Sequence, residues 1–154
     1  MRAVISTGSN MGDASAHLAS VVAALKPVAT SSVYETAPWG GVEQPPFLNQ
    51  VLIVETDLDP HALLAKCQRL EQEADRVRDV RWGPRTLDVD IVDIDGYTSD
   101  DPALTVPHPR AHLREFVLRP WLEVEPGATL DDVPVADLIA TLEPQGVTWV
   151  GEEP

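Results

Sequence analysis

Two aspartates separated by a single residue, Asp88 and Asp90, follow the arginines Arg81 and Arg85 by a few positions. Side chains of an extended chain alternate between faces, so both carboxylates share one face if this segment is a strand. Their Cβ atoms then lie about 6–7 Å apart, a gap that suits two divalent metal ions held about 3.5–4 Å from one another. Hard oxygen ligands favour Mg²⁺ or Mn²⁺ over zinc. Arginines beside such a pair are what phosphoryl transfer from a nucleotide requires.

The acid pair and the arginines each also have an ordinary explanation. Aspartates are common on the solvated strand edges of acidic proteins, and an Asp-x-Asp pattern alone is weak evidence for a metal site. A group of neighbouring arginines forms either a solvated helix end with a basic turn or a binding site for an anion. The acid pair beside them favours the anion site. The arginines of this group are Arg69, Arg76, Arg78, Arg81 and Arg85.

A second group of residues has the character of a pocket for a flat heterocycle. Trp39 lies in a stretch rich in proline and glycine, and Phe47 and Asn49 share one face of the strand predicted to follow. Stacking on an aromatic ring would supply affinity, and the amide would recognise donors and acceptors. The alternative is that Phe47 begins a core strand and Asn49 binds loop backbone.

A third group lies further along the chain, where His108 stands between two prolines ahead of Arg114 and Phe116. A histidine between prolines lies on a stiff, extended segment. A lone histidine is more often structural than catalytic, but His108 and Arg114 could donate to phosphate while Phe116 forms a second aromatic wall. The glycine-rich stretch 8–12 lacks the lysine and hydroxyl of a P-loop. We interpret it as a turn from strand to helix, with Asp13 as the helix cap.

The composition limits the classes of protein to which the chain belongs. Its 154 residues, 44% hydrophobic and 23% charged, are typical of a single globular domain over 1–154. No apolar run approaches the ~18 residues of a membrane span, and the N-terminus lacks the apolar core of a signal peptide. Cys67 is the only cysteine, so we predict a cytoplasmic protein without an intramolecular disulfide. The net charge of −14 disfavours nucleic acid as a partner.

The predicted elements follow the order strand, helix, strand, strand, helix, strand, which indicates an α+β, ferredoxin-like βαββαβ core. If the strand that carries the acids is regular, Asp93 faces away from Asp88 and Asp90. Beyond residue 95 we expect additional short helices and strands, including a helix interrupted by Pro120. The core strands are predicted over 2–6, 28–36, 47–56 and 85–94, and the core helices over 18–25 and from Asp59-Pro60 onward. The C-terminal elements are predicted within 112–124, over 135–142 and over 147–150.

Several segments together resemble the 6-hydroxymethyl-7,8-dihydropterin pyrophosphokinases of folate biosynthesis. They occur in the order typical of that family over roughly residues 1–126, and the motif R-W-G-P-R-T-L-D-x-D is highly specific. The matching segments are GSNMGD at 8–13, YET at 34–36, QPPFLN at 44–49, RVRDVRWGPRTLDVDI at 76–91 and LTVPHPRAHLREFVLRP at 104–120. The resemblance implies a ferredoxin-like fold and Mg²⁺-dependent transfer of pyrophosphate from ATP to the pterin hydroxymethyl group, with release of AMP.

The resemblance also implies roles for individual residues. Asp88 and Asp90 would hold two Mg²⁺ ions, with ATP as co-substrate, and Arg76 and Arg85 would be the chief catalytic arginines. The residues expected to contact ATP are Gln68, Arg78, Arg81, Thr105, His108 and Arg114. Those expected to contact the pterin are Thr36, Trp39, Phe47, Asn49, Trp82 and Phe116. Such an enzyme is expected to act on small molecules as a monomer, without nucleic acid or a membrane.

Two other classes compete with this interpretation. One is a ferredoxin-like regulatory module that holds a nucleotide without turnover, against which the combination of Arg85 with both acids argues. The other is a metal-dependent phosphohydrolase or nuclease. The net charge of −14 and the aromatic residues disfavour nucleic acid as its substrate.

Overall fold

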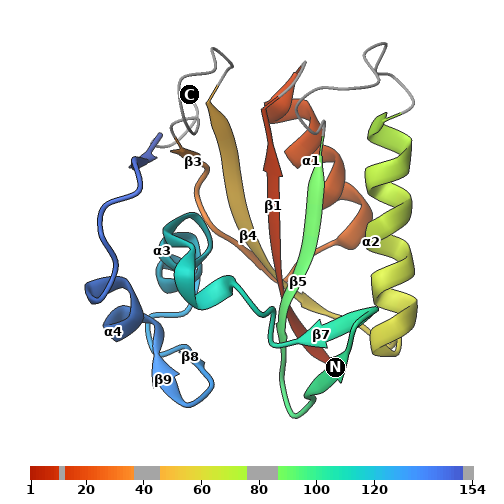
Figure 1. The fold of residues 1–154 in the computed structure, drawn as a ribbon. Helices are drawn as coiled ribbons and strands as arrows, with labels where there is room; N and C mark the ends of the chain where they lie inside the picture. The colour runs from red at the N-terminus through yellow and green to blue at the C-terminus, as the bar shows by residue number, and fades with distance from the viewer. Residues whose placement is uncertain (11–12, 37–45, 76–86, 151–154) are drawn as a thin grey trace.

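An antiparallel sheet forms the centre of the chain in a computed structural model that describes residues 1–10, 13–36, 46–75 and 87–150 (Figure 1). The sheet order is β10-β3-β4-β1-β5, and β2 also pairs with β4. Its strands are β1 (Arg2–Ser9), β2 (Ala29–Thr30), β3 (Tyr34–Thr36), β4 (Phe47–Glu55), β5 (Asp88–Ile94) and β10 (Val147–Trp149). The helices are α1 (Ala14–Leu25), α2 (Pro60–Asp75), α3 (Glu115–Val124), α4 (Val135–Ala140) and the 3-10 turn η1 (Ala111–Leu113).

The order of the strands confirms the predicted ferredoxin-like core. The acid-bearing strand β5 lies beside β1, β1 lies beside β4, and β4 lies beside β3, all antiparallel. Helix α1 follows β1, and α2 connects β4 to β5. Two short hairpins were not predicted: β6 (Ser99–Asp101) with β7 (Leu104–Val106), and β8 (Thr129–Leu130) with β9 (Val133–Pro134).

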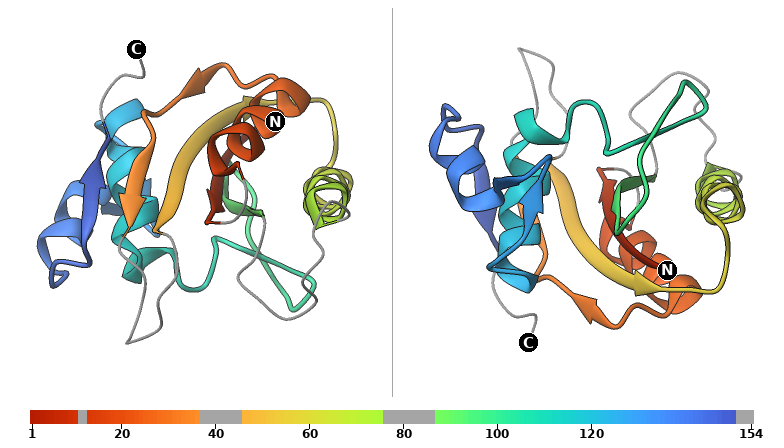
Figure 2. Two further views of the ribbon diagram at one scale, coloured as in Figure 1. Left: turned by 90° about the horizontal axis from the view of Figure 1, so that it is seen from above. Right: turned by 90° about the horizontal axis from the view of Figure 1, so that it is seen from below.

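The sheet separates two hydrophobic layers, with α1 and α2 on one side and α3 and α4 on the other (Figure 2). Strand β4 supplies both layers, because Leu52 and Val54 face α1 and α2 while Val51 and Ile53 face α3. All four of these side chains are buried. A strand covered on both faces is apolar at every position, which explains the continuous apolar run in this segment.

Aspartate caps begin both of the long helices, as predicted. The Asp13 carboxylate accepts a hydrogen bond from the Ala16 amide at 3.1 Å, at the start of α1. The Asp59 carboxylate accepts one from the Ala62 amide at 2.8 Å, immediately before Pro60. Each cap satisfies one of the amides that have no partner inside the helix. The starts of α1 and α2 are therefore fixed by residues local to them.

The prediction that Pro120 interrupts a helix was wrong. Pro120 lies inside α3, which is continuous from Glu115 to Val124. An internal proline costs a helix about 3 kcal/mol. Three neighbours of Pro120 are buried, and each buried apolar side chain contributes about 1.5–3 kcal/mol. These neighbours are Val117, Leu118 and Trp121, and their burial against the sheet outweighs the cost of the proline.

Asp93 was expected to face away from Asp90 only in a regular strand, and β5 is not regular. Strand β1 pairs Val4 with Asp93, but the next residue, Ile5, with Ile91, so β5 contains one extra residue at this point. Val4 belongs to the layer beneath α3, and directly opposite side chains point to the same face. Asp93 therefore lies on the α3 side of the sheet, as Asp90 does.

In the ranges that the structure describes, no helix combines the length and the apolar composition needed to cross a lipid bilayer.

Candidate active site

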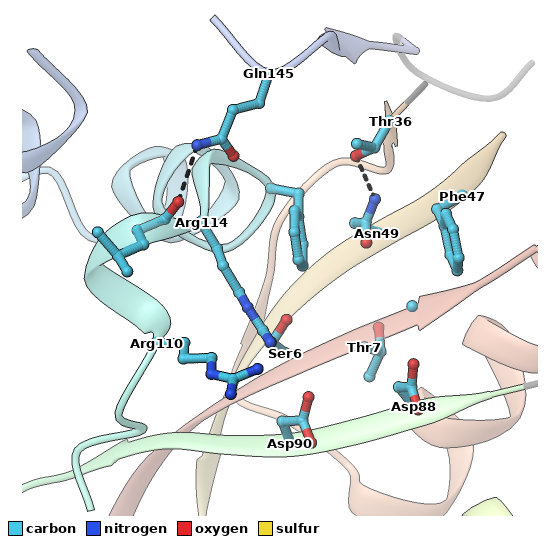
Figure 3. A pocket seen from close by; sticks show the side chains of 13 residues that line it. Ser6, Thr7, Thr36, Phe47, Asn49, Asp88, Asp90, Arg110, Arg114 and Gln145 are labelled. Atoms are coloured by element: carbon cyan, nitrogen blue, oxygen red, sulfur yellow. Dashed lines mark hydrogen bonds between the residues drawn. The ribbon is translucent and has the colours of Figure 1, made fainter. Parts of the chain in front are cut away.

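A cavity of about 540 Å³ opens on the α3 side of the sheet, near the ends of β1, β4 and β5 (Figure 3). Acids come from β5, basic side chains from the segment that leads into α3, and aromatic rings from β4 and α3. The lining residues are Ser6, Thr7, Gly8, Thr36, Phe47, Asn49, Asp88, Asp90, Arg110, Leu113, Arg114, Phe116 and Gln145. The cavity thus has one charged end and one aromatic end.

The acid pair lies on the floor of the charged end. Asp88 and Asp90 both line the cavity and are half-buried, whereas Val89 between them is buried in the layer beneath α1 and α2. This alternation is the one predicted for an extended segment. The Val89 amide, on the outer edge of β5, donates a hydrogen bond to the Glu71 carboxylate of α2 at 2.9 Å. Helix α2 therefore fixes the strand edge at the residue between the two acids.

The donor set at this end fits Mg²⁺ bound together with phosphate. Asp88 and Asp90 supply hard carboxylate oxygens. Within the described residues, no cluster of three or more histidine, cysteine, aspartate or glutamate side chains is arranged to enclose a metal ion. Mg²⁺ is usually held by one or two carboxylates plus water and substrate phosphates, whereas structural zinc requires four protein ligands. A pair of acids in an open cavity matches the first pattern.

Two arginines extend over the acids from the opposite wall of the cavity. Arg110 and Arg114 point from the segment before α3 towards Asp90 and Ser6 (Figure 3). The Arg114 Cζ atom lies 5.6 Å from the centroid of the Phe116 ring, a distance at which the ring attracts the cation. Positive charge above a pair of acids is suited to an anionic ligand that carries its own metal ions.

His108 lies beside the charged end without lining the cavity. Its Nδ1 atom accepts a hydrogen bond from the Arg110 amide at 3.2 Å. Burial lowers the pKa of His108, against the opposing effect of Asp90. The positive charges of Arg114 and Arg110 lower the His108 pKa further. The imidazole is therefore held neutral near pH 7, with its proton on Nε2 because Nδ1 is an acceptor.

The opposite end of the cavity is aromatic and amide-lined. The Asn49 Nδ2 atom donates a hydrogen bond to Thr36 Oγ1 at 2.7 Å, and both residues are buried. Gly8 lies opposite Asn49, where an added Cβ would lie 3.1 Å from Asn49 Oδ1. Phe47 and Phe116 supply the aromatic surface. A buried amide of fixed orientation beside two rings can recognise a flat heterocycle.

The structure brings many of the predicted site residues together. Thr36, Phe47, Asn49, Asp88, Asp90, Arg114 and Phe116 all line the one cavity. Three others do not line it. Gln68 is exposed on α2, the Thr105 hydroxyl donates to the Asp101 carbonyl at 3.1 Å, and His108 lies as described above. The predictions for Trp39, Arg76, Arg78, Arg81, Trp82 and Arg85 fall outside the described residues.

Sequence reasoning missed Arg110 and Gln145, which both line the cavity. Arg110 had a usable signal, because it is four residues before Arg114 in a segment already expected to bind phosphate. Gln145 had none, because it lies far from every recognised motif. Its contact with the start of α3 is made only through the fold.

Comparison with known proteins supports one family. The family model for 7,8-dihydro-6-hydroxymethylpterin-pyrophosphokinase (HPPK) matches residues 4–126. A 2-amino-4-hydroxy-6-hydroxymethyldihydropteridine pyrophosphokinase of Mycobacterium tuberculosis is 46% identical over 93% of this chain and 85% of its own length. The protein of that name from Methylorubrum extorquens is 39% identical over 97% and 98%.

The solved structures agree at the level of the fold. An HPPK-DHPS of Plasmodium falciparum, crystallised as the A437G form with STZ-DHP, superposes with a TM-score of 0.68 at 14% identity. The match covers 90% of this chain and 45% of the Plasmodium chain, so this chain spans less than half of that protein. The family match, the two relatives and the shared fold together show that this chain belongs to the 7,8-dihydro-6-hydroxymethylpterin-pyrophosphokinase family.

Proposed function

We propose that this chain transfers pyrophosphate from ATP to 6-hydroxymethyl-7,8-dihydropterin and releases AMP, a step of folate biosynthesis. The relatives at 39–47% identity carry the name of this activity. The observation that carries the proposal is the joint lining of one cavity by the acids Asp88 and Asp90 and by the buried Asn49–Thr36 pair. An enzyme that joins a nucleoside triphosphate to a flat heterocycle needs a charged end and an aromatic end within one site.

The aromatic end is assigned to the pterin. The ring would stack between Phe47 and Phe116, while Asn49, held by Thr36, would recognise the polar edge of the heterocycle. Trp39 and Trp82 are proposed to complete this part of the site. Stacking supplies affinity for any flat ring, so the amide would supply the selectivity.

The charged end is assigned to the phosphates of ATP. Asp88 and Asp90 would hold Mg²⁺, for which we propose two ions. When bound, Mg²⁺ would neutralise phosphate charge and orient the phosphates for in-line displacement. Arg110 and Arg114 would bind phosphate oxygens directly. The other residues proposed to act on ATP are Gln68, Arg76, Arg78, Arg81, Arg85, Thr105 and His108.

The reaction requires the hydroxymethyl oxygen of the pterin to attack the β-phosphorus of ATP. The bond from that phosphorus to the oxygen shared with the α-phosphate breaks, AMP leaves, and the attacking hydroxyl releases its proton to water. Arginine guanidinium groups would stabilise the charge on the transferring group. Because the pterin is held by Phe47 and Asn49 on one side of Asp88, both substrates can be aligned before reaction.

The test is product analysis after incubation with Mg²⁺, ATP and the hydroxymethyl dihydropterin. AMP formed only when pterin is present is the expected result. ADP as product, or ATP breakdown without pterin, would overturn the proposal and favour a phosphohydrolase. Binding of ATP without turnover would favour a regulatory module. The same proposal takes residues 1–154 as one domain that acts as a monomer in the cytoplasm.

A further inference from the structure

The side chain of Gln145 holds the backbone on both sides of Arg114. Gln145 Nε2 donates a hydrogen bond to the Leu113 carbonyl at 2.9 Å, the dashed line at Gln145 in Figure 3. Gln145 Oε1 accepts one from the Glu115 backbone amide at 2.9 Å. The two bonds span the residue between their backbone partners, which is Arg114. Gln145 comes from the segment between α4 and β10, outside residues 4–126 that match the family model.

A third hydrogen bond joins Gln145 to the first residue of α3, Glu115. The backbone amide of Gln145 donates to Glu115 Oε1 at 2.9 Å, and Glu115 Oε2 accepts a hydrogen bond from Arg119. Glu115 is 6% exposed, so this carboxylate is desolvated and its hydrogen bonds are worth more than surface ones. Gln145 and Glu115 therefore each donate a backbone amide to the side chain of the other.

Gln145 also takes the place of a local helix cap. Arg114 is the N-cap residue of α3 and makes no side-chain cap hydrogen bond, unlike Asp13 at the start of α1. The first amide of α3 is satisfied instead by the Gln145 oxygen. The Arg114 side chain points into the cavity, and Gln145, a residue distant in sequence, caps the helix in its place.

We infer that Gln145 is a positioning residue that orients Arg114 toward the phosphates of ATP. The inference rests on the proposed function for the identity of the ligand. The backbone at Arg114 has hydrogen bonds on each side from a single amide group, so rotation of this segment would break both. A displacement of about 1 Å at a substrate-binding group can cost about 100-fold in rate. We call the two Gln145 bonds, to Leu113 and to Glu115, the clamp. Losing the clamp would displace Arg114, which is proposed to contact ATP, without removing the Arg114 side chain.

The first experiment compares Gln145→Met with Gln50→Met. Gln50 also donates a side-chain hydrogen bond to a backbone carbonyl, that of Ser31 at 2.9 Å, and does not line the cavity. We expect Gln145→Met to weaken Mg-ATP binding about tenfold, measured by calorimetry, and to lower kcat/KM for ATP by a similar factor. The control should stay within twofold in both. Hydrogen exchange at the Glu115 amide should accelerate only in Gln145→Met.

A double-mutant cycle decides whether Gln145 acts through Arg114. In the Arg114→Met background, adding Gln145→Met should weaken ATP binding by less than twofold. The same factor in both backgrounds would mean that Gln145 has a general structural role, and would overturn the inference. So would unchanged binding in Gln145→Met itself.

A second variant keeps the test decisive if Gln145→Met does not fold. Gln145→Asn keeps an uncharged amide but is one methylene shorter, so it cannot bond both the Leu113 carbonyl and the Glu115 amide. Its loss of ATP binding should be measurable and should also vanish in the Arg114→Met background. Loss that persists there would contradict the inference. Absence of pterin-dependent AMP in the wild-type chain would instead reject the proposed function, while the ATP-binding cycle would still report on the clamp.

Discussion

At the scale of single residues, each end of the cavity depends on a few polar side chains whose positions are fixed by hydrogen bonds or by strand alternation. Asn49 donates to Thr36 at 2.7 Å, and Gly8 opposite leaves room for the amide oxygen. On the other side, Asp88 and Asp90 occupy alternate positions of one strand. If the proposed function is right, substitutions at these positions should affect pterin binding and phosphate transfer separately.

Asp90→Asn should lower the rate of pterin-dependent AMP formation by about 10³-fold, because an amide is a much weaker ligand for Mg²⁺ than a carboxylate. The matched control is Asp100→Asn, an exposed position on β6, which should keep the wild-type rate. The measurement is the initial rate at saturating ATP and pterin over a range of Mg²⁺ concentrations. A rate within tenfold of wild type would remove Asp90 from the metal site.

Thr36→Val should raise KM for the pterin about tenfold and leave KM for ATP within twofold. The change leaves the buried Asn49 N–H without its acceptor, which costs about 1–3 kcal/mol, and a factor of ten corresponds to about 1.4 kcal/mol. Thr141→Val serves as the control, because Thr141 Oγ1 donates to the Leu138 carbonyl in α4, away from the cavity. Equal effects on both KM values would argue against a pterin-specific role.

At the scale of elements, β5 carries the acids and its neighbours hold it in place. Strand β1 pairs along one edge of β5, and the Glu71 carboxylate of α2 accepts the Val89 amide on the other. The start of α2 depends in turn on the Asp59 cap. The position of the acids thus depends on α2 through the hydrogen bond from the Val89 amide to Glu71. The start of α3, next to Arg114, is held by Gln145.

Asp59→Ala should lower the free energy of unfolding by about 1 kcal/mol, the usual cost of losing a side-chain cap. Asp57→Ala, two positions earlier on an exposed site, should change it by less than half as much. Urea denaturation followed by circular dichroism measures both. If the two variants are equally stable, the 2.8 Å contact to the Ala62 amide contributes nothing net to folding.

The elements differ in how far the sequence predicts them. The starts of α1 and α2 are predictable because Asp13 and Asp59 act on amides three positions away. The continuity of α3 through Pro120 is not, since it depends on burial of neighbours such as Trp121 against the sheet. The same holds for Gln145, whose partners lie 30 and 32 positions away in the sequence.

At the scale of the whole molecule, the proposed phosphate site combines acids and arginines on a strongly acidic chain. The chain has a net charge of −14, yet Arg110 and Arg114 extend into the cavity. Elsewhere acids approach one another across elements. Burial raises the pKa of Asp93 to about 6, with added repulsion from Asp95, Asp131 and Glu125 against a hydrogen bond from the Ile94 backbone.

Asp93→Asn should stabilise the protein at pH 8 by about 1 kcal/mol. The pKa of Asp93 is about 6 in the folded state against 3.8 for the free side chain, so the folded state binds more protons between these values. The wild type therefore gains stability as pH falls from about 6 to 4 and loses it as pH rises. The full shift would correspond to about 3 kcal/mol, which partial exposure reduces.

The measurement is the free energy of unfolding of both proteins between pH 4 and 8. The difference between Asp93→Asn and wild type should shrink as pH falls towards 4, because the wild-type carboxyl then becomes neutral as well. Asp100→Asn, at an exposed position, is the control for the change in net charge alone. A difference that does not depend on pH would contradict the assignment to Asp93.

The sequence by itself determined the family, the order of the core elements, the helix caps and the common face of Asp88 and Asp90. Each of these depends on contiguous motifs or on contacts a few residues apart, which local propensity and side-chain alternation control. Only the tertiary structure decided which way Asp93 faces, because one extra residue in β5 is visible only against β1. It also decided that Gln145 bonds the backbone on both sides of Arg114, because closing a contact over such a separation depends on the packing of α3 against the sheet and on the path of the chain after α4.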